Sequence, residues 1–162
     1  MIRAAGEQDI PGILAVWNAV IRDTVITFNP VEKSADDLVQ FLADKAIAGH
    51  AVLVAVAGDA VLGFATYGQF RGGVGYQHTV EHSIMLAPAA RGRGMGRGLL
   101  TAIEDHARTG GAHSIFAGVS AGNPPGVAFH AALGYVQVAV LPQVGRKFGK
   151  WWDLVLMQKF LS

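Results

Sequence analysis

The chain has 162 residues, of which 51% are hydrophobic and 15% charged, with a formal net charge of +1 and no cysteine. This length fits one domain over residues 1–162, and the apolar content excludes a disordered chain. The lack of cysteine excludes disulfides, thiolate zinc sites and thiol catalysis. The small net charge argues against general nucleic-acid binding, and no apolar run reaches the roughly 18 residues of a membrane span. Without a signal-peptide pattern at the start, we expect a cytoplasmic protein that binds neither nucleic acid nor membrane.

Two helices are predicted before the first long strands. A short strand over residues 2–4 leads to a helix that runs through Trp17, with Asp9 as its N-cap. A second helix is expected over residues 34–49, where Ser-x-x-Asp is close to a capping box and glycine ends the helix. The apolar residues that recur along it are Leu38, Phe41, Leu42 and Ile47.

The rest of the chain alternates between strand-like and helix-like segments. Strands are expected over 52–57, 61–70, 79–86, 114–119, 137–140 and 152–157, and helices over 95–107 and 124–133. The resulting order, βααβββαβαββ, predicts an α/β fold with a mixed, mostly antiparallel central sheet flanked by helices.

The run from Arg91 to Gly98 combines four glycines with three arginines between a strand and a helix. Glycines let the backbone approach a ligand closely, and a helix N-terminus favours an anion, so this turn predicts a phosphate cradle. It is not a P-loop, because no Gly-Lys-Ser/Thr follows, and it lacks the context of a dinucleotide fingerprint. The alternative is a flexible Arg-Gly loop that contacts nothing or touches RNA.

The spacing Arg91-x-x-Gly94-x-Gly96 after a strand resembles the acetyl-CoA pyrophosphate loop of the GNAT superfamily of N-acetyltransferases. The segment 123–135 resembles the second motif of that superfamily, in which an Asn opens a helix that ends near Gly-Phe or Gly-Tyr. With the segments 76–83 and 145–153, the resemblance is to the phosphinothricin and methionine sulfoximine acetyltransferase branch and covers nearly the whole chain. It implies a GNAT fold, acetyl-CoA as donor, acetylation of the α-amino group of small amino-acid analogues, and a homodimer.

The resemblance also implies where acetyl-CoA binds. The strand end would pair with the pantetheine arm, and the glycine run would hold the pyrophosphate through backbone amides. The cofactor-binding residues expected on this basis are Ile84, Met85, Leu86, Arg91, Gly92, Arg93, Gly94, Met95, Gly96, Arg97, Gly98 and Asn123.

Glu81 and His130 are the candidate catalytic residues. An α-amino group is mostly protonated at pH 7, so a carboxylate that removes its proton is useful, and strand alternation places Glu81 on the same face as Ser83 and Met85. His130 occupies the position at which most of the superfamily has a Tyr that protonates the departing thiolate, and imidazole suits that task. The alternatives are a structural ion pair for Glu81 and a packed side chain for His130.

The string from His78 to His82 also fits His-x-x-Glu-His, an inverted zinc-protease signature. Zinc ligation by this motif needs both histidines on one helical face. In a strand, four steps of about 3.3 Å separate them by roughly 13 Å, too far to share an ion. Because this segment is rich in β-branched residues, we predict a strand and no metal site.

Thr27 and Phe28 correspond to residues that line the acceptor pocket in the related acetyltransferases, and Arg71 is a candidate to bind an acceptor carboxylate through its planar fork. A surface arginine is the alternative for Arg71. Lys147 and Trp151 are expected to border the pocket without a catalytic role, although Trp151 also fits a core or dimer-interface residue.

The sequence therefore predicts an acetyl-CoA-dependent N-acetyltransferase that acts by direct attack on a small amino-acid-like amine. Two alternatives stay open: another acceptor, such as a polyamine, an aminoglycoside or a protein N-terminus, and a non-catalytic module that senses acyl-CoA.

Overall fold

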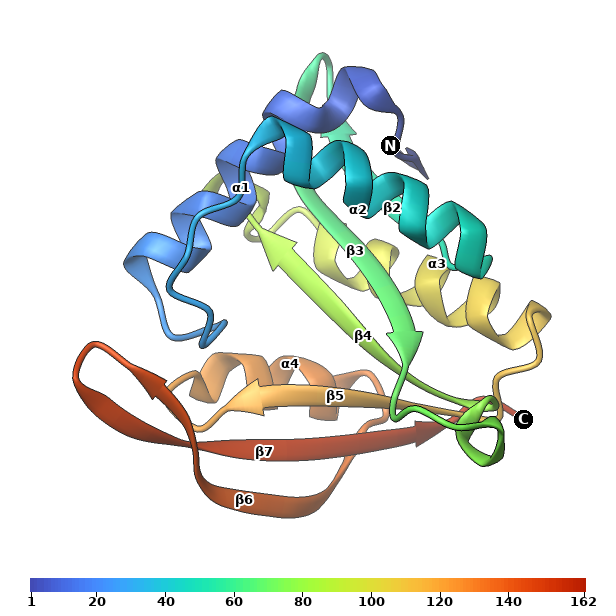
Figure 1. Cartoon of the computed structure of the whole chain (residues 1–162), viewed down its shortest axis with the longest axis vertical. Helices are drawn as coiled ribbons and strands as arrows, with labels where there is room; N and C mark the ends of the chain where they lie inside the picture. Colours follow the sequence, from blue (N-terminus) through green and yellow to red (C-terminus); the bar gives the residue numbers. More distant parts are fainter.

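The computed structural model describes residues 1–162 and contains four helices and a seven-stranded sheet (Figure 1). The order of the elements is the predicted βααβββαβαββ, with short 3-10 turns between some of them. The elements are β1 (Ile2–Ala4), α1 (Ile10–Asp23), α2 (Ala35–Ala48), β2 (Val52–Ala57), β3 (Ala60–Gln69), β4 (Thr79–Leu86), α3 (Met95–Thr109), β5 (Ser114–Ser120), α4 (Pro124–Ala132), β6 (Val136–Lys147) and β7 (Lys150–Phe160). No helix is long and apolar enough to cross a membrane.

The sheet has the strand order β1-β2-β3-β4-β5-β7-β6, and only the β4–β5 pair is parallel. That pair is short: β4 residues 79–82 face β5 residues 114–117, and the pairing stops at His82. Beyond this point β4 stays paired with β3 as far as Leu86, and β5 stays paired with β7 as far as Ser120. The sheet therefore splits into two halves that diverge, as the spreading of β4 and β5 in Figure 1 shows.

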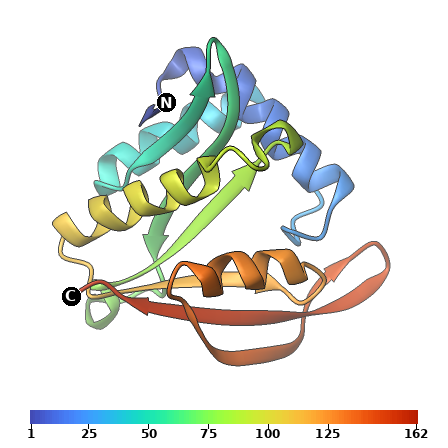
Figure 2. The ribbon, with the colours of Figure 1, turned by 180° about the vertical axis from the view of Figure 1, so that it is seen from behind.

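Helices cover both faces of the sheet. The two views show α1 and α2 on one face of the first half of the sheet and α3 on the other, whereas α4 lies against β5 and β6 in the second half (Figures 1 and 2). Apolar side chains fill both interfaces: Ile13, Leu38 and Phe64 lie in the cluster beneath α1 and α2, whereas Leu99 and Ile115 lie in the larger cluster beneath α3. This packing fixes β4 between two helical layers.

Helix α2 begins and ends as predicted, but one of the residues expected on its buried apolar face, Ile47, is exposed. The Ser34 hydroxyl accepts from the Asp37 amide at 3.1 Å, the Asp37 carboxylate accepts from the Ser34 amide at 2.8 Å, and Gly49 ends the helix with φ +73°. Leu38 is fully buried, whereas Ile47 is 86% exposed. Ile47 follows Leu38 by nine positions, which at 3.6 residues per turn places it on the opposite side of the helix.

Helix α1 continues to Asp23, beyond the predicted end at Trp17. Asp9 is its N-cap residue, as predicted, but the Asp9 side chain makes no capping hydrogen bond to the helix. The Asp9 carboxylate instead accepts from both terminal nitrogens of the Arg3 guanidinium, at 2.7 and 2.9 Å, and from the Gly6 amide at 2.8 Å. Asp9 therefore joins β1 to the turn before α1, a tertiary contact that the local pattern does not reveal.

The last two strands are longer than the sequence pattern predicts and form one hairpin. Its turn residues Phe148 and Gly149 have φ of +54° and +72°, the backbone sign that a tight type I′ turn requires. Pro142 and Gly145 interrupt the apolar alternation in β6, and the register shifts between Leu141 and Gly145. An irregular strand of this kind reads as a loop in sequence.

Candidate active site

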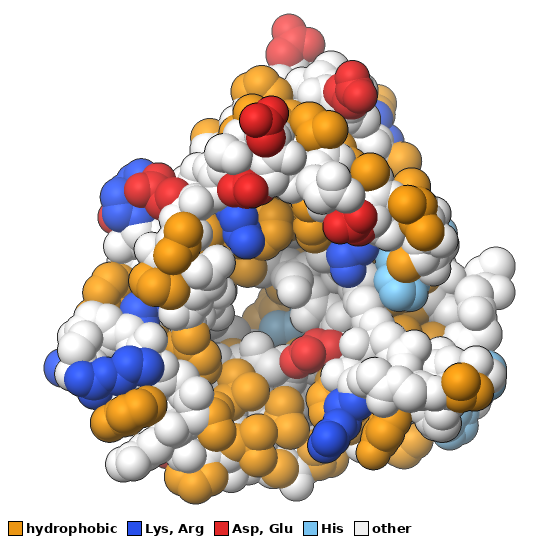
Figure 3. Space-filling model, viewed as in Figure 1, with side chains coloured by type: hydrophobic (Ala, Val, Ile, Leu, Met, Phe, Trp, Pro, Cys, Tyr) orange, Lys and Arg blue, Asp and Glu red, His pale blue; other side chains and the backbone are white.

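A cavity of about 670 Å³ occupies the region where β4 and β5 diverge. In the space-filling view the molecule is hollowed at its centre, between the helical half and the last strands (Figure 3). Nine of the residues predicted to form the site line this cavity: Thr27, Phe28, Glu81, Ile84, Met85, Leu86, Arg91, Asn123 and His130. The cavity is also lined by three polar side chains and a glycine that were not predicted from the sequence, namely His82, Ser83, Ser120 and Gly118.

The edge of β4 that faces β5 has no partner strand beyond His82. Residues 83–86 line the cavity along this stretch. An unpaired strand edge can bind an extended ligand that carries amide groups, as an added strand would bind. The cavity thus offers backbone hydrogen bonds on one wall.

The glycine run forms a turn that opens toward solvent at the start of α3. Gly92 and Gly94 have φ of +73° and +72°, and a Cβ on either would meet no atom within 4 Å. The first-turn amides of a helix have no acceptor within the helix, so the start of α3 can bind an anion. Six residues of the run line a second cavity of about 280 Å³, namely Arg91, Gly92, Gly94, Met95, Gly96 and Arg97.

Two members of the run lie outside both cavities. A Cβ on Gly98 would come within 2.5 Å of the Ile2 side chain, so Gly98 allows α3 to pack on β1. Arg93 is exposed and lines neither cavity. The contact of these two residues with the cofactor stays a prediction.

Glu81 projects from β4 into the divergence between the strands. Its side chain is half-buried, and a Cβ on Gly118 of β5 would lie 2.9 Å from its Oε2. Glycine at position 118 therefore leaves room for the carboxylate. Burial raises the pKa of Glu81, and no charged neighbour contributes to the shift. No cation pairs with the Glu81 carboxylate, so the structure does not support the alternative of a structural ion pair.

His82 and His130 form a buried pair. Their Nε2 atoms are 3.1 Å apart, the rings are stacked with centroids 5.0 Å apart, and both residues are at most 6% exposed. The His130 Nδ1 lies 2.7 Å from the Gly126 carbonyl oxygen, so Nδ1 carries a proton and Nε2 accepts from the His82 Nε2–H. The remaining nitrogen, His82 Nδ1, is buried without a hydrogen-bond partner.

The surroundings keep both histidines neutral. Burial and the neighbouring imidazole lower the pKa of His82 to about 3, and burial lowers the pKa of His130. The Tyr135 ring packs edge-on against both, and its hydroxyl donates to a Glu104 oxygen at 2.9 Å. Lys159 donates to the other Glu104 oxygen at 2.7 Å. A polar network therefore supports this wall of the cavity from behind.

The segment from His78 to His82 does not form a helical zinc motif. β4 is a strand from Thr79 onward, as predicted. His78 precedes it, with Nδ1 3.0 Å from the Gly111 carbonyl oxygen, whereas His82 stacks on His130. The two histidines thus have separate partners.

Helix α4 begins at Pro124, and Asn123 is its N-cap, as its place in the sequence motif suggests. The Asn123 Oδ1 accepts from the Gly126 amide at 3.2 Å, while the residue lines the large cavity. Asn123 thereby fixes the helix that carries His130.

The wall of the cavity formed by the end of α1, the loop after it and β7 is apolar. It includes Val20, Ile26, Phe28 and Leu154, together with Thr27. Arg71 does not line this cavity: its guanidinium lies 5.7 Å from the Tyr76 ring centroid, on an exposed loop, and its contact with an acceptor carboxylate stays a prediction. Spacing in sequence did not reveal where the loop after β3 turns.

The buried histidine pair predicts a pH dependence of stability. Below about pH 6.5 the unfolded chain protonates His82, whereas the folded chain does not until about pH 3, so folding stability is present above pH 6.5 and lost as the pH falls. Between pH 6.5 and 5 the expected loss from His82 is about 2 kcal/mol. Urea unfolding at both pH values measures it.

His82→Gln should reduce this pH slope, and His113→Gln, at an exposed position, should leave it unchanged. An identical slope in wild type and His82→Gln would show that His82 is not buried in neutral form.

Comparison with known proteins agrees with this geometry. The pattern of the Acetyltransferase (GNAT) family matches residues 17–135. The chain is 38% identical to the L-amino acid N-acyltransferase MnaT of Escherichia coli, over 97% of this chain and 91% of that protein. It is 39% identical to an L-methionine sulfoximine/L-methionine sulfone acetyltransferase of Pseudomonas aeruginosa, over 97% of this chain and 92% of that one.

A solved structure shows the same fold with the donor in place. The phosphinothricin acetyltransferase of Sinorhizobium meliloti in complex with acetyl-CoA superposes with a TM-score of 0.95 at 28% identity, covering 100% of this chain and 88% of that one. The free β4 edge and the glycine turn of this chain fit such a donor, since both present unpaired backbone groups. The chain belongs to the GNAT acetyltransferase family and is an N-acetyltransferase that uses acetyl-CoA.

Proposed function

We propose that this enzyme transfers acetyl to the α-amino group of a small amino-acid analogue of the phosphinothricin, methionine sulfoximine or methionine sulfone type. The observation that carries the proposal is the Glu81 carboxylate, which has no charged partner and lies in a cavity with an apolar acceptor wall. The relatives named for methionine sulfoximine, methionine sulfone and phosphinothricin support the substrate class.

Acetyl-CoA would be held by the free edge of β4 at residues 84–86 and by the amides at the start of α3. It supplies the acetyl thioester that the amine attacks. Gly92 and Gly94 adopt positive φ, which a side chain would strain, and Arg91 lines both cavities and can bind phosphate. A Cβ added at Gly96 would lie 3.0 Å from the Leu86 side chain and 3.2 Å from the Phe129 ring, so the start of α3 packs closely on α4.

Glu81 is the proposed base. Burial raises the pKa of Glu81, which makes the carboxylate a stronger base toward an ammonium group. The proton that leaves the attacking nitrogen goes to Glu81, directly or through water. The carbon–nitrogen bond forms as the carbon–sulfur bond breaks, and the sulfur leaves with the electron pair and takes up a proton.

His130 remains our candidate to deliver that proton. In the resting arrangement its Nδ1 is bonded to Gly126 and its Nε2 accepts from His82, so Nε2 must gain a proton before it can donate one. A cation on this buried pair is unfavourable, which favours giving the proton up to the thiolate.

The acceptor class is tested by thiol release from acetyl-CoA with a panel of amines. We expect fast turnover with phosphinothricin, methionine sulfoximine and methionine sulfone, and slow turnover with spermidine, kanamycin and an alanine-terminated peptide. Fast turnover with only the peptide or a polyamine would replace the proposed acceptor, and acetyl-CoA binding without any turnover would contradict the whole proposal.

Glu81→Gln tests the base. We expect turnover at pH 7 to fall about 10²-fold or more, while the Kd for acetyl-CoA stays unchanged. Wild-type turnover should decline as the pH falls through the raised pKa of Glu81, because a protonated carboxyl group cannot accept the proton. The turnover of Glu81→Gln should not show this decline. Asp59→Asn, in the exposed β2–β3 turn, is the control. A parallel loss of acetyl-CoA binding in Glu81→Gln would assign Glu81 a structural role.

We also propose that the enzyme is a homodimer in the cytoplasm. β6 is an edge strand, and its exposed side chains form an apolar strip, which in a monomer would face water. The strip consists of Val136, Val138, Val140, Leu141 and Val144. Light scattering should give twice the chain mass of 17.0 kDa, and Val140→Lys should give the single chain mass. A monomer in the wild type would contradict the dimer.

A further inference from the structure

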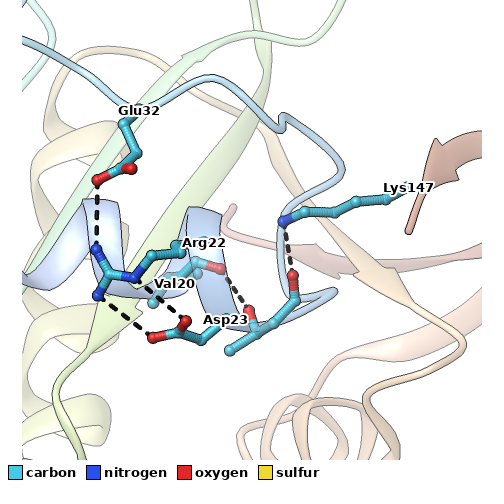
Figure 4. Close-up of polar contacts among 6 residues, drawn as sticks. Val20, Arg22, Asp23, Glu32 and Lys147 are labelled. Atoms are coloured by element: carbon cyan, nitrogen blue, oxygen red, sulfur yellow. Dashed lines mark hydrogen bonds and ion pairs between the residues drawn. The ribbon is translucent and has the colours of Figure 1, made fainter. Parts of the chain in front are cut away.

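The loop between α1 and α2 carries three residues of the acceptor wall, Ile26, Thr27 and Phe28, and is held from outside by the β6–β7 hairpin. The Lys147 ammonium donates to the carbonyl oxygens of Thr24 at 2.6 Å and Thr27 at 2.8 Å. Figure 4 shows Lys147 reaching from β6 toward this loop and the bond to the first of these carbonyls. One side chain thus fixes the loop at two points, from a strand about 120 residues later.

Two further contacts place the same hairpin against the loop. Gly145 precedes Lys147 by two positions on β6, and a Cβ there would overlap the ring of Phe28. Trp152 of β7 donates its indole N–H to the Lys147 carbonyl at 2.9 Å, and its ring lies with Val25 beside Gly122. The hairpin therefore supports the loop over its length from residue 24 to residue 28.

Lys147 is unusual because its ammonium is buried without a carboxylate. The residue is 4% exposed, its pKa is lowered by burial alone, and its charge faces two carbonyl dipoles and the Phe148 ring at 5.1 Å. A dehydrated cation bonded to backbone oxygens holds the main chain itself, and its removal leaves both carbonyls without their partner. Backbone contacts of this kind fix where the loop side chains point.

The loop has three other polar contacts with its surroundings. Arg22 reaches Glu32 at 3.4 Å, but both side chains are at least half exposed, and such surface pairs contribute little (Figure 4). Asn18 bonds the backbone of Lys33 at the far end of the loop. The Thr24 hydroxyl donates to the Val20 carbonyl oxygen at 2.7 Å, which ties the first loop residue to α1. Thr27 and Phe28 have no such tie to α1, so their position depends mainly on the hairpin.

We propose that Lys147 is a positioning residue for the acceptor: by holding the Thr24 and Thr27 carbonyls it sets the place of Thr27 and Phe28, and thereby acceptor affinity and selectivity. The inference rests on the proposed function for the identity of the acceptor only. The donor is bound by β4 and α3, which Lys147 does not contact, so its effect is confined to the acceptor half of the reaction.

The test is Lys147→Met, compared with Lys150→Met at an exposed position on the same hairpin. A displacement of about 1 Å can cost roughly 10²-fold in rate, so we expect kcat/KM for the acceptor to fall at least about tenfold through a raised KM. The KM for acetyl-CoA should stay within about twofold, and Lys150→Met should match wild type. An unchanged acceptor KM, or an equal rise in both KM values, would overturn the proposal.

Hydrogen exchange gives a readout that does not need turnover. Amides of residues 24–33 should exchange faster in Lys147→Met than in wild type, whereas those of β4 should not change. If no amine of the panel is acetylated, the proposed function fails, but this comparison still decides whether Lys147 holds the loop. Equal exchange in both proteins would overturn the proposal.

Gly145→Ala is the second variant, in case Lys147→Met does not fold. The added methyl group displaces the Phe28 ring without removing any hydrogen bond, so it too should raise the acceptor KM and leave acetyl-CoA binding unchanged. Acetyl-CoA affinity equal to that of wild type shows that each variant is folded. Wild-type acceptor kinetics in Gly145→Ala would show that the position of Phe28 does not matter.

Discussion

The short parallel pairing between β4 and β5 is the constraint on which the rest of this structure depends. Because the two strands pair only as far as His82, each continues with a different partner and the sheet opens. The opening exposes the backbone edge of β4, creates the cavity and gives Glu81 room over Gly118. Such a gap would be unstable in a sheet without support. The helical layers on β4 and the long hairpin behind β5 hold the two halves apart.

Support for the gap comes from polar groups as well as from the apolar core. On one wall, the pair of His82 and His130 rests on Tyr135, which bonds to Glu104 and through it to Lys159. A buried network of this type favours one arrangement of the side chains, because each hydrogen bond left unmade costs free energy in a medium of low dielectric constant. The His82 Nδ1 is the exception within the network, because it is buried without a hydrogen-bond partner.

The opposite wall is assembled from segments far apart in the chain. The loop after α1 supplies Thr27 and Phe28, and the hairpin near the C-terminus fixes that loop through Lys147 and Gly145. If this wall binds the acceptor and the glycine turn and β4 bind the donor, as proposed, the two halves of the site rest on different supports. On this proposal, changes in the loop and the hairpin alter the acceptor wall and leave the donor site intact.

Local pattern in the sequence determined the order of the elements, the strand that carries Glu81, the capping of α2 and the glycine turn, because each depends on neighbouring residues alone. Tertiary structure decided the rest. It placed Arg71 on an exposed loop, Gly98 against β1 and Lys147 beneath the acceptor wall. It also made His82 the partner of His130 across 48 positions. These contacts join residues whose separation in sequence carries no periodic signal, so only the packing of the sheet and its helices defines them.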